Sequence, residues 1–434
     1  MFQVFIFCWK FLKNNVIYFK FIDLPNEGYD FPILYIIIII VFVVTFAVVV
    51  AVLVYKRLKS KSKKLQETRR SSFNSLRNSC TDGNKRFDSC ANFKSQVNLS
   101  SHTTKREISR SLFTITKHLG SGYFGTVSKG ELTGLYGSNS KTTVAIKSLK
   151  GPAEGAELRD FLQEIKIMSN TNAHLNLVSM IGSCASELEN EKEVWLIIEF
   201  CRVGDLKTFL VENKKRILKI DSNDLINDKC LLHWAHDVSK GMEFLSKQNI
   251  MHGDLAARNI MLDENHVQFS RHIAKIADFG LSKRFYNNLE YEKQTRNLIP
   301  WKWMAYEFLT CDYFTLTSDV WSFGVVLWEI FSFGKTPYGQ KQYDEVISQL
   351  ESGNPLSCPS EVKGITSWDP EIVYEDIKKL CFIEDPNERG TFSQVVETIE
   401  RHLSEDELSS YQEMEEKYQT ERSIYYMHLV KNKT

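Results

Sequence analysis

The stretch from Ile33 to Tyr55 is apolar at nearly every position and carries no charge, and it limits what this chain can fold into more than any other feature. A helix needs about 20 such residues to span the hydrocarbon core of a bilayer. A buried core helix is rarely apolar all round at this length, and the apolar part of a cleaved signal peptide is shorter, at about 7–15 residues. We therefore predict a single transmembrane helix over residues 33–55.

Basic residues gather on the C-terminal side of this stretch, from Lys56 to Arg70, diluted only by Glu67. Lysine and arginine are in excess on cytoplasmic flanks. We therefore expect a single-pass protein of the cell membrane, with residues 1–32 as a short extracellular segment and the rest in the cytoplasm. The outer segment has one cysteine, Cys8, and offers no disulfide framework. A cleaved signal sequence is weakly indicated, because lysines follow the apolar start instead of preceding it.

Residues 56–111 form a basic, Ser/Asn-rich juxtamembrane linker with too few aliphatic side chains to build a core. Its first part could lie against anionic lipid, with about 1 kcal/mol from each basic residue, or serve only as a stop-transfer anchor. Acidic and basic residues balance at 54 each in the 434-residue chain, so net charge indicates no nucleic-acid partner.

Residues 112–403 are rich in apolar side chains, which predicts one folded domain followed by a tail, residues 404–434. The first third reads as strands and the part after Leu231 as helices, and a polar stretch of mixed charge, 212–229, lies between them. Strands are predicted near Thr114, Thr126, Thr143 and Val194, and helices over Leu158–Met168, Trp234–Leu245 and Val320–Phe331.

Gly120, Gly122 and Gly125 follow the pattern G-x-G-x-x-G. A dinucleotide-binding turn has the same pattern but opens a helix, whereas the residues after Gly125 alternate like a strand. A glycine hairpin lets the backbone approach nucleotide phosphates without a Cβ clash. Downstream, Lys147 ends an apolar strand and Glu164 lies on the following helix as its plausible partner. A surface lysine and a solvated glutamate are the alternatives.

His252-Gly253-Asp254-Leu255-Ala256-Ala257-Arg258-Asn259, followed by Asp278-Phe279-Gly280, has the spacing of a phosphoryl-transfer site. Catalysis in such a site is mostly positioning and neutralisation of phosphate charge. Asp254 can accept or orient the proton of an attacking hydroxyl, and Asn259 and Asp278 offer the hard oxygen ligands that suit Mg²⁺. The ordered set of all these motifs is too long to match by chance.

The set resembles the catalytic domain of protein kinases. Ala256-Ala257-Arg258 and Pro300–Ala305 resemble the tyrosine-specific branch, above all the split receptor tyrosine kinases of the growth-factor type. Serine/threonine kinases, the alternative, commonly have lysine where Ala256 stands. The resemblance implies an α+β bilobal protein kinase fold, with a small β-rich N-lobe and a larger helical C-lobe, preceded here by the transmembrane helix. It also implies that 212–229 is a short kinase insert.

The resemblance further implies transfer of the γ-phosphate of ATP to tyrosine hydroxyls on proteins, with Mg²⁺, or Mn²⁺ in its place. Asp254 would be the catalytic base, with Lys147, Glu164 and Arg258 also catalytic. Asn259 and Asp278 would be metal ligands. Ile198 would be the gatekeeper, although its strand could simply be an interior one. The implied ATP-binding set is Gly120, Ser121, Gly122, Gly125, Val127, Ala145, Lys147, Ile198, Glu199 and Cys201.

Three tyrosines are candidates for phosphorylation. Tyr286 and Tyr291 lie where related receptor kinases carry activation-loop tyrosines. In the tail, Tyr411 and Met414 fit Y-x-x-M, which resembles a docking site for SH2-domain adaptors, but with Tyr418 they also suit an apolar helix face. Other implied partners are protein tyrosine substrates, a second copy or a partner receptor, and the lipid bilayer.

Gly253 departs from the resemblance, because most kinases have there an arginine that meets the activation-loop phosphate. Losing that contact, worth about 1.5–3 kcal/mol, predicts activity that depends less on phosphorylation of Tyr291. A catalytically weak or inactive scaffold is the alternative function. Two further changes replace prolines next to the expected structural ion pair of Glu307 and Arg389; they are Tyr306 and Gly390.

Overall fold

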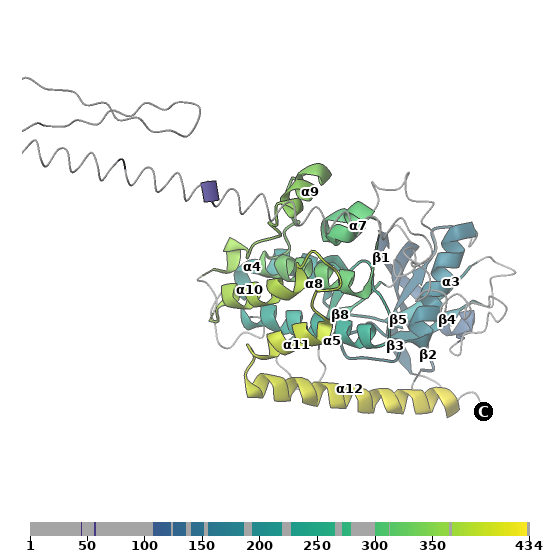
Figure 1. Cartoon of the computed structure of the whole chain (residues 1–434). Coiled ribbons are helices and arrows are strands. Elements are labelled where there is room, and N and C mark those ends of the chain that lie inside the picture. Colours follow the sequence, from purple (N-terminus) through teal and green to yellow (C-terminus); the bar gives the residue numbers. More distant parts are fainter. Residues whose placement is uncertain are drawn as a thin grey trace, which may run out of the picture. The chain divides into compact units, whose positions relative to one another are not determined.

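The computed structural model describes residues 45, 56–57, 107–122, 125–135, 140–151, 155–185, 193–218, 227–264, 271–278, 300–311, 313–363 and 367–431 (Figure 1). The predicted extracellular segment, nearly all of the predicted transmembrane helix and linker, and Tyr286 and Tyr291 lie outside these ranges. Within them, no helix is both long enough and apolar enough to cross a membrane.

The first lobe is a five-stranded antiparallel sheet of order β1-β2-β3-β5-β4, with α3 (Gly155–Asn170) next to β4. The four strands and the helix predicted in this region are confirmed. The sequence patterns do not indicate β4, because all its residues are buried and therefore do not alternate. The strands are β1 (Phe113–Gly122), β2 (Gly125–Thr133), β3 (Lys141–Ser148), β4 (Met180–Cys184) and β5 (Trp195–Glu199).

Strand alternation in β3 sends its side chains to two environments. Val144 and Ile146 join an apolar cluster that contains Phe113 and covers one face of the sheet. Successive side chains of a strand point to opposite faces. Ala145 and Lys147 are buried as well but do not belong to that cluster, so they face the other side of the sheet.

The second lobe is mainly helical and is built around α5 (Lys229–Lys247) and α8 (Leu316–Phe331). Both contain a predicted helix, which is confirmed. Their apolar side chains form one core with those of the neighbouring helices. The other elements are α4 (Leu206–Ile217), α7 (Tyr306–Cys311), α9 (Tyr343–Glu351), α10 (Pro370–Cys381) and α11 (Phe392–Glu400), with a small sheet of β6 (Gly204–Asp205), β7 (Ile260–Glu264) and β8 (His272–Ile276).

Two further segments are partly or wholly helical. The stretch 212–229 is helical at both ends, because α4 runs to Ile217 and α5 begins at Lys229. Residues 219–226 lie outside the described ranges. The tail forms a long helix, α12 (Glu405–Lys431), shown in yellow in Figure 1, which packs against the folded domain.

A buried ion pair fastens α7 to the turn before α11. The two terminal nitrogens of Arg389 donate to the two carboxylate oxygens of Glu307, each at 2.7 Å. This pair is expected from the resemblance and is confirmed. The neighbouring Gly390 has a local reason, since a Cβ there would come within 2.9 Å of the Leu380 Cβ. Tyr306, the other replacement, is buried.

Candidate active site

The loop from His252 to Asn259 ends in a 3-10 turn, η2 (Ala257–Asn259), that leads into β7. Asp319 of α8 holds the start of this loop. Its two carboxylate oxygens accept the backbone N–H groups of His252 at 2.7 Å and Gly253 at 3.0 Å. Burial raises the pKa of Asp319 to about 7, although the two amides oppose the shift. The central helix of the lobe thus fixes the backbone just before Asp254.

Gly253 has a φ of +78°, in the left-handed region that favours glycine. A residue with a Cβ in this region loses about 1–2 kcal/mol. The departure from the kinase pattern therefore relieves backbone strain at the same time as it removes a cationic side chain.

Asp254 is held by two partners from the same loop. Arg258 donates to one carboxylate oxygen, and the amide nitrogen of Asn259 donates to the other at 2.8 Å. Burial raises the pKa of Asp254 to about 6, while Arg258 and Asn259 act against that shift. A carboxyl group that is fixed in orientation and titrates near neutral pH can take a proton from a hydroxyl.

Lys147 connects three elements across the site. Its Nζ lies 2.6 Å from Glu164 Oε1 on α3 and 3.0 Å from Oδ1 of Asp278, which follows β8. Burial alone would lower the pKa of Lys147, but the two carboxylates outweigh it and hold the pKa above its usual value. The predicted pairing with Glu164 is present, and the lysine remains a cation that can attract phosphate.

Backbone contacts bring Asn259 and Asp278 to the same place. The amide of Ala277 donates to the carbonyl of Asn259 at 2.8 Å, and Nε2 of His252 lies 3.0 Å from the Ala277 carbonyl. Amide and carboxylate oxygens fit Mg²⁺, which proteins bind through one or two such groups plus substrate phosphates. The part of the chain that the structure describes holds no cluster of three or more His, Cys, Asp or Glu side chains that could hold a metal ion.

The glycine motif lies at the turn between β1 and β2, where residues 123–124 are outside the described ranges. A Cβ added to Gly120 or Gly122 would meet no described atom within 4 Å, whereas one added to Gly125 would clash with the Ser148 carbonyl oxygen. Gly125 is therefore required by the fold itself. For Gly120 and Gly122 the close approach of nucleotide phosphates stays a prediction from the sequence.

The segment that links the two lobes follows β5. The Glu199 carboxylate accepts the backbone amide of Ser179 at 2.6 Å and also bonds Lys275 at 3.3 Å. Cys201 is buried, and burial raises the pKa of its thiol, so it is a poor nucleophile. The side chains of Glu199 and Cys201 therefore both serve the structure.

Glu329 of α8 joins the catalytic loop to the segment 300–305, a connection that the sequence patterns do not single out. One of its carboxylate oxygens accepts both the Ala257 amide and the Trp303 indole N–H, each at 2.8 Å. The Arg258 guanidinium lies over the Trp303 ring, 4.6 Å from its centroid. Burial raises the pKa of Glu329 to about 7. Its sequence signal, shared with Asp319, is an acidic residue inside an otherwise apolar helix.

Comparison with known families identifies the protein family of this chain. A model of the protein tyrosine and serine/threonine kinase family matches residues 113–399. The chain belongs to this family. Its bilobal domain is therefore a protein kinase domain, and the relatives below place it with the tyrosine kinases.

Three relatives illustrate this likeness. The fibroblast growth factor receptor of Halocynthia roretzi is 32% identical over 70% of this chain, and that of Strongylocentrotus purpuratus is 35% identical over 71%. The tyrosine kinase receptor Cad96Ca of Drosophila melanogaster is 31% identical over 66%. The matches cover 40%, 30% and 35% of these relatives, so the chain spans well under half of their length.

One candidate residue, Tyr411, lies in the tail and apart from this site. Tyr411 is only 4% exposed, which favours the apolar-face interpretation of the Y-x-x-M tyrosine over a docking site in this conformation.

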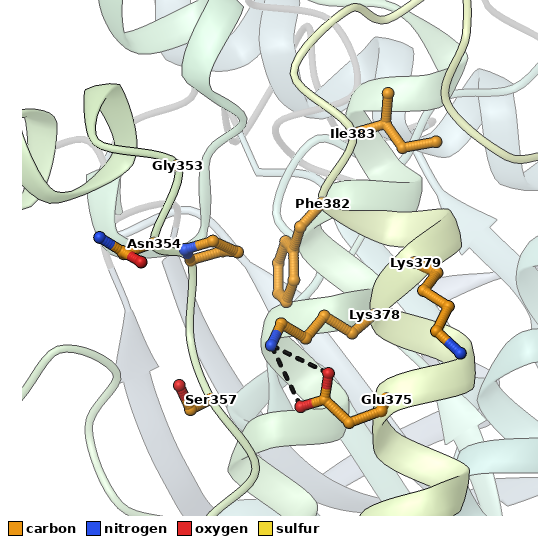
Figure 2. Close-up of a pocket in the computed structure, with 9 residues that line it drawn as sticks. Gly353, Asn354, Ser357, Glu375, Lys378, Lys379, Phe382 and Ile383 are labelled. Atoms are coloured by element: carbon orange, nitrogen blue, oxygen red, sulfur yellow. Dashed lines mark hydrogen bonds and ion pairs between the residues drawn. The ribbon is translucent and has the colours of Figure 1, made fainter. Parts of the chain in front are cut away.

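Figure 2 shows a pocket beside α10, lined by Gly353, Asn354, Glu375, Lys378, Phe382 and their neighbours. Lys378 there bonds both oxygens of Glu375 at 3.1 Å, so its charge is already compensated.

Proposed function

We propose that this chain is a membrane-anchored, receptor-like protein tyrosine kinase that transfers the γ-phosphate of ATP to tyrosine hydroxyls on proteins. One observation carries the proposal. Lys147 pairs with both Glu164 and Asp278 while Arg258 and Asn259 hold Asp254, so the residues of both lobes are assembled at once. An inactive scaffold would not need this arrangement.

The residues divide the work as follows. Asp254 orients the tyrosine hydroxyl and takes its proton, and Arg258 and Asn259 keep the carboxylate directed. Lys147, held by Glu164, binds the phosphates. Asn259 and Asp278 would hold Mg²⁺, or Mn²⁺ in its place, which when bound neutralises charge on the phosphates. The glycine hairpin covers the nucleotide, and the backbone of Glu199 and Cys201 binds its base.

The tyrosine preference has its own structural support. Trp303 is fixed by its bond to Glu329 and by Arg258 over its ring. Arg258 in turn bonds Asp254. Trp303, in the segment that resembles tyrosine kinases, is therefore linked through Arg258 to the catalytic base, which suits a site that must place a tyrosine hydroxyl beside Asp254.

We further propose the architecture that the sequence predicts: residues 1–32 outside the cell, 33–55 across the membrane, 56–111 as the linker, 112–403 as the kinase domain and 404–434 as the tail. The names of the relatives above, which are receptors, support this proposal. Self-association or a partner receptor would then activate the kinase, and Gly253 would make that activation depend little on phosphate at Tyr291.

The test uses the full chain, purified in detergent, dephosphorylated and mixed with ATP and Mg²⁺. Phosphorylated residues are mapped by mass spectrometry, with Asp254→Asn as the control. We expect phosphotyrosine that is lost in the control. Phosphoserine or phosphothreonine alone would overturn the substrate class, and nucleotide binding with no phosphorylation of the chain or of a tyrosine polymer would favour the scaffold.

A further inference from the structure

The tail helix α12 presents one side to the kinase domain, formed by Tyr411, Met414 and Tyr418. Tyr411 is 4% and Met414 3% exposed, and they form an apolar cluster with Leu175 and Ile273 to which Tyr418 adds its ring. Lys240 of α5 lies over the Tyr411 ring, 5.5 Å from its centroid. A side this well buried belongs to the fold of the domain.

Tyr411 contacts the turn that follows α3. Its hydroxyl donates to Oδ1 of Asn176 at 2.6 Å. The Asn176 amide nitrogen donates to the carbonyl of Ala274 at 3.0 Å, and the Asn176 carbonyl accepts the amide of Ile276 at 2.9 Å. Through Asn176, Tyr411 is thereby connected to the backbone of Ala274 and Ile276 on β8.

Tyr418 closes a second set of contacts two turns further on. Its hydroxyl lies 2.7 Å from Oγ of Ser179, and Lys275 Nζ lies over its ring at 4.9 Å. Lys275 bonds Glu199 at 3.3 Å, and Glu199 accepts the backbone amide of Ser179 at 2.6 Å. Tyr418, Ser179, Glu199 and Lys275 thus form a closed ring of contacts that joins the tail to β5 and β8.

Both sets of contacts reach residues that lie beside the proposed nucleotide site. Glu199 is the last residue of β5 and stands two positions before Cys201, in the segment that links the lobes. Lys275 and Ile276 lie on β8 just before Asp278, whose carboxylate is 3.0 Å from Lys147. A shift of either strand would move a residue proposed to touch the nucleotide or its metal.

We propose that Tyr411 and Tyr418 are positioning residues for nucleotide binding, which act through Asn176, Ser179 and Lys275 to hold the lobe-linking segment and the Asp278 strand in register. The inference rests on the proposed ATP site. It differs from a general stabilising role for the tail, because some tail contacts bind α5 of the helical lobe and do not lead to the proposed nucleotide site. Glu407, for example, bonds His233 and Lys229 of α5, each at 3.1 Å.

The experiment measures Mg-ADP affinity by calorimetry on the full chain in detergent. The test variant is Tyr411→Phe with Tyr418→Phe, which keeps both rings and removes both hydroxyls. The matched control is Glu407→Gln, which weakens docking of the same helix far from the nucleotide site. We expect the test variant to bind Mg-ADP about fivefold or more weakly, and the control to stay within about twofold of the parent chain.

A second readout separates positioning from stability. The KM for ATP should rise in the double variant while the KM for a tyrosine peptide does not. Should Tyr411→Phe impair folding, Tyr418→Phe alone, at a half-buried position, gives the same test. Unchanged Mg-ADP affinity, equal weakening in Glu407→Gln, or absence of Mg-ADP binding in the parent chain would each overturn the inference. Because Mg-ADP binding requires no transfer, a chain that binds it but phosphorylates nothing would refute the proposed function alone.

Discussion

At the scale of single residues, burial and two neighbouring side chains together set the pKa of Asp254. Burial raises the pKa of Asp254 to about 6, and Arg258 and Asn259 limit the rise. A base must be deprotonated to act, so the working form is present above this pKa. Stability has the opposite sign: a carboxyl group whose pKa is raised in the fold contributes less as pH rises from about 4 to about 6.

The first prediction concerns this titration. The kcat/KM for a tyrosine peptide should fall about tenfold per unit as pH drops below about 6, because the protonated Asp254 cannot accept a proton. In Arg258→Ala the falling limb should move to higher pH, since the cation that lowers the pKa is gone. Initial rates between pH 5 and 8 test this. A limb that stays near the ordinary aspartate value of about 4 would contradict it.

The second prediction concerns the backbone at Gly253. Replacing it with alanine should lower the free energy of unfolding by about 1–2 kcal/mol, because φ there is +78°. Urea unfolding measures the change. Gly120→Ala is the control, since a Cβ at Gly120 would meet no described atom within 4 Å. Equal effects of the two substitutions would show that the conformation of Gly253 does not matter.

At the scale of elements, α8 organises the site from the core. Its two acids, Asp319 near the start and Glu329 in the last turn, bind the backbone on either side of Asp254. Both are almost completely buried, and burial raises both pKa values to about 7. The stability of a buried carboxyl group depends on each hydrogen bond that it accepts.

A third prediction follows for Trp303. Trp303→Phe keeps a ring under Arg258 but removes the indole N–H that Glu329 accepts at 2.8 Å. The loss should cost about 1–3 kcal/mol of stability and raise the KM for a tyrosine peptide more than the KM for ATP. Trp368→Phe is a control, because its indole donates to the carbonyl of Asp228 outside the site. Equal KM changes for peptide and ATP would argue against a role in substrate seating.

A fourth prediction concerns the buried pair that fastens α7. Arg389→Met should destabilise the domain by about 3–5 kcal/mol, because it leaves the buried Glu307 carboxylate without its forked partner. Lys379→Met, which breaks an exposed pair with Asp376, should cost under about 1 kcal/mol. Thermal unfolding compares them. Similar losses of stability in the two variants would show that burial does not increase the contribution of the Glu307–Arg389 pair.

At the scale of the whole molecule, the sequence predicts the bilobal domain and much of the site, but not how the tail packs. Lys147 with Glu164 and Glu307 with Arg389 are predictable because each stands at a fixed place in an ordered series of motifs. β4 and the docking of α12 are not. β4 has no alternation, and the hydrogen-bond partners of Tyr411 and Tyr418 lie more than 200 positions away, where no local pattern can indicate them.

The fifth prediction tests the proposed anchor, which apart from Thr45 lies outside the described residues. The full chain should stay in the membrane fraction after alkaline extraction. Val43→Arg combined with Val48→Arg should release it, because each charge near the centre of a span costs about 2.5–3.5 kcal/mol. Arg57→Ala with Lys59→Ala is the control, since it alters the flank and keeps the span. Retention of the double arginine variant would refute the anchor.

The buried hydroxyl of Tyr411 has one more consequence. No enzyme can modify it while α12 is seated, so phosphate can enter only during the moments when the helix has left. If leaving costs a few kcal/mol, roughly 0.1–10% of molecules are open at any instant. Once modified, the residue could no longer return to its partner Asn176, because a doubly charged group does not fit an apolar cluster. Phosphate would then accumulate on Tyr411 slowly, at a rate set by how often the tail helix detaches.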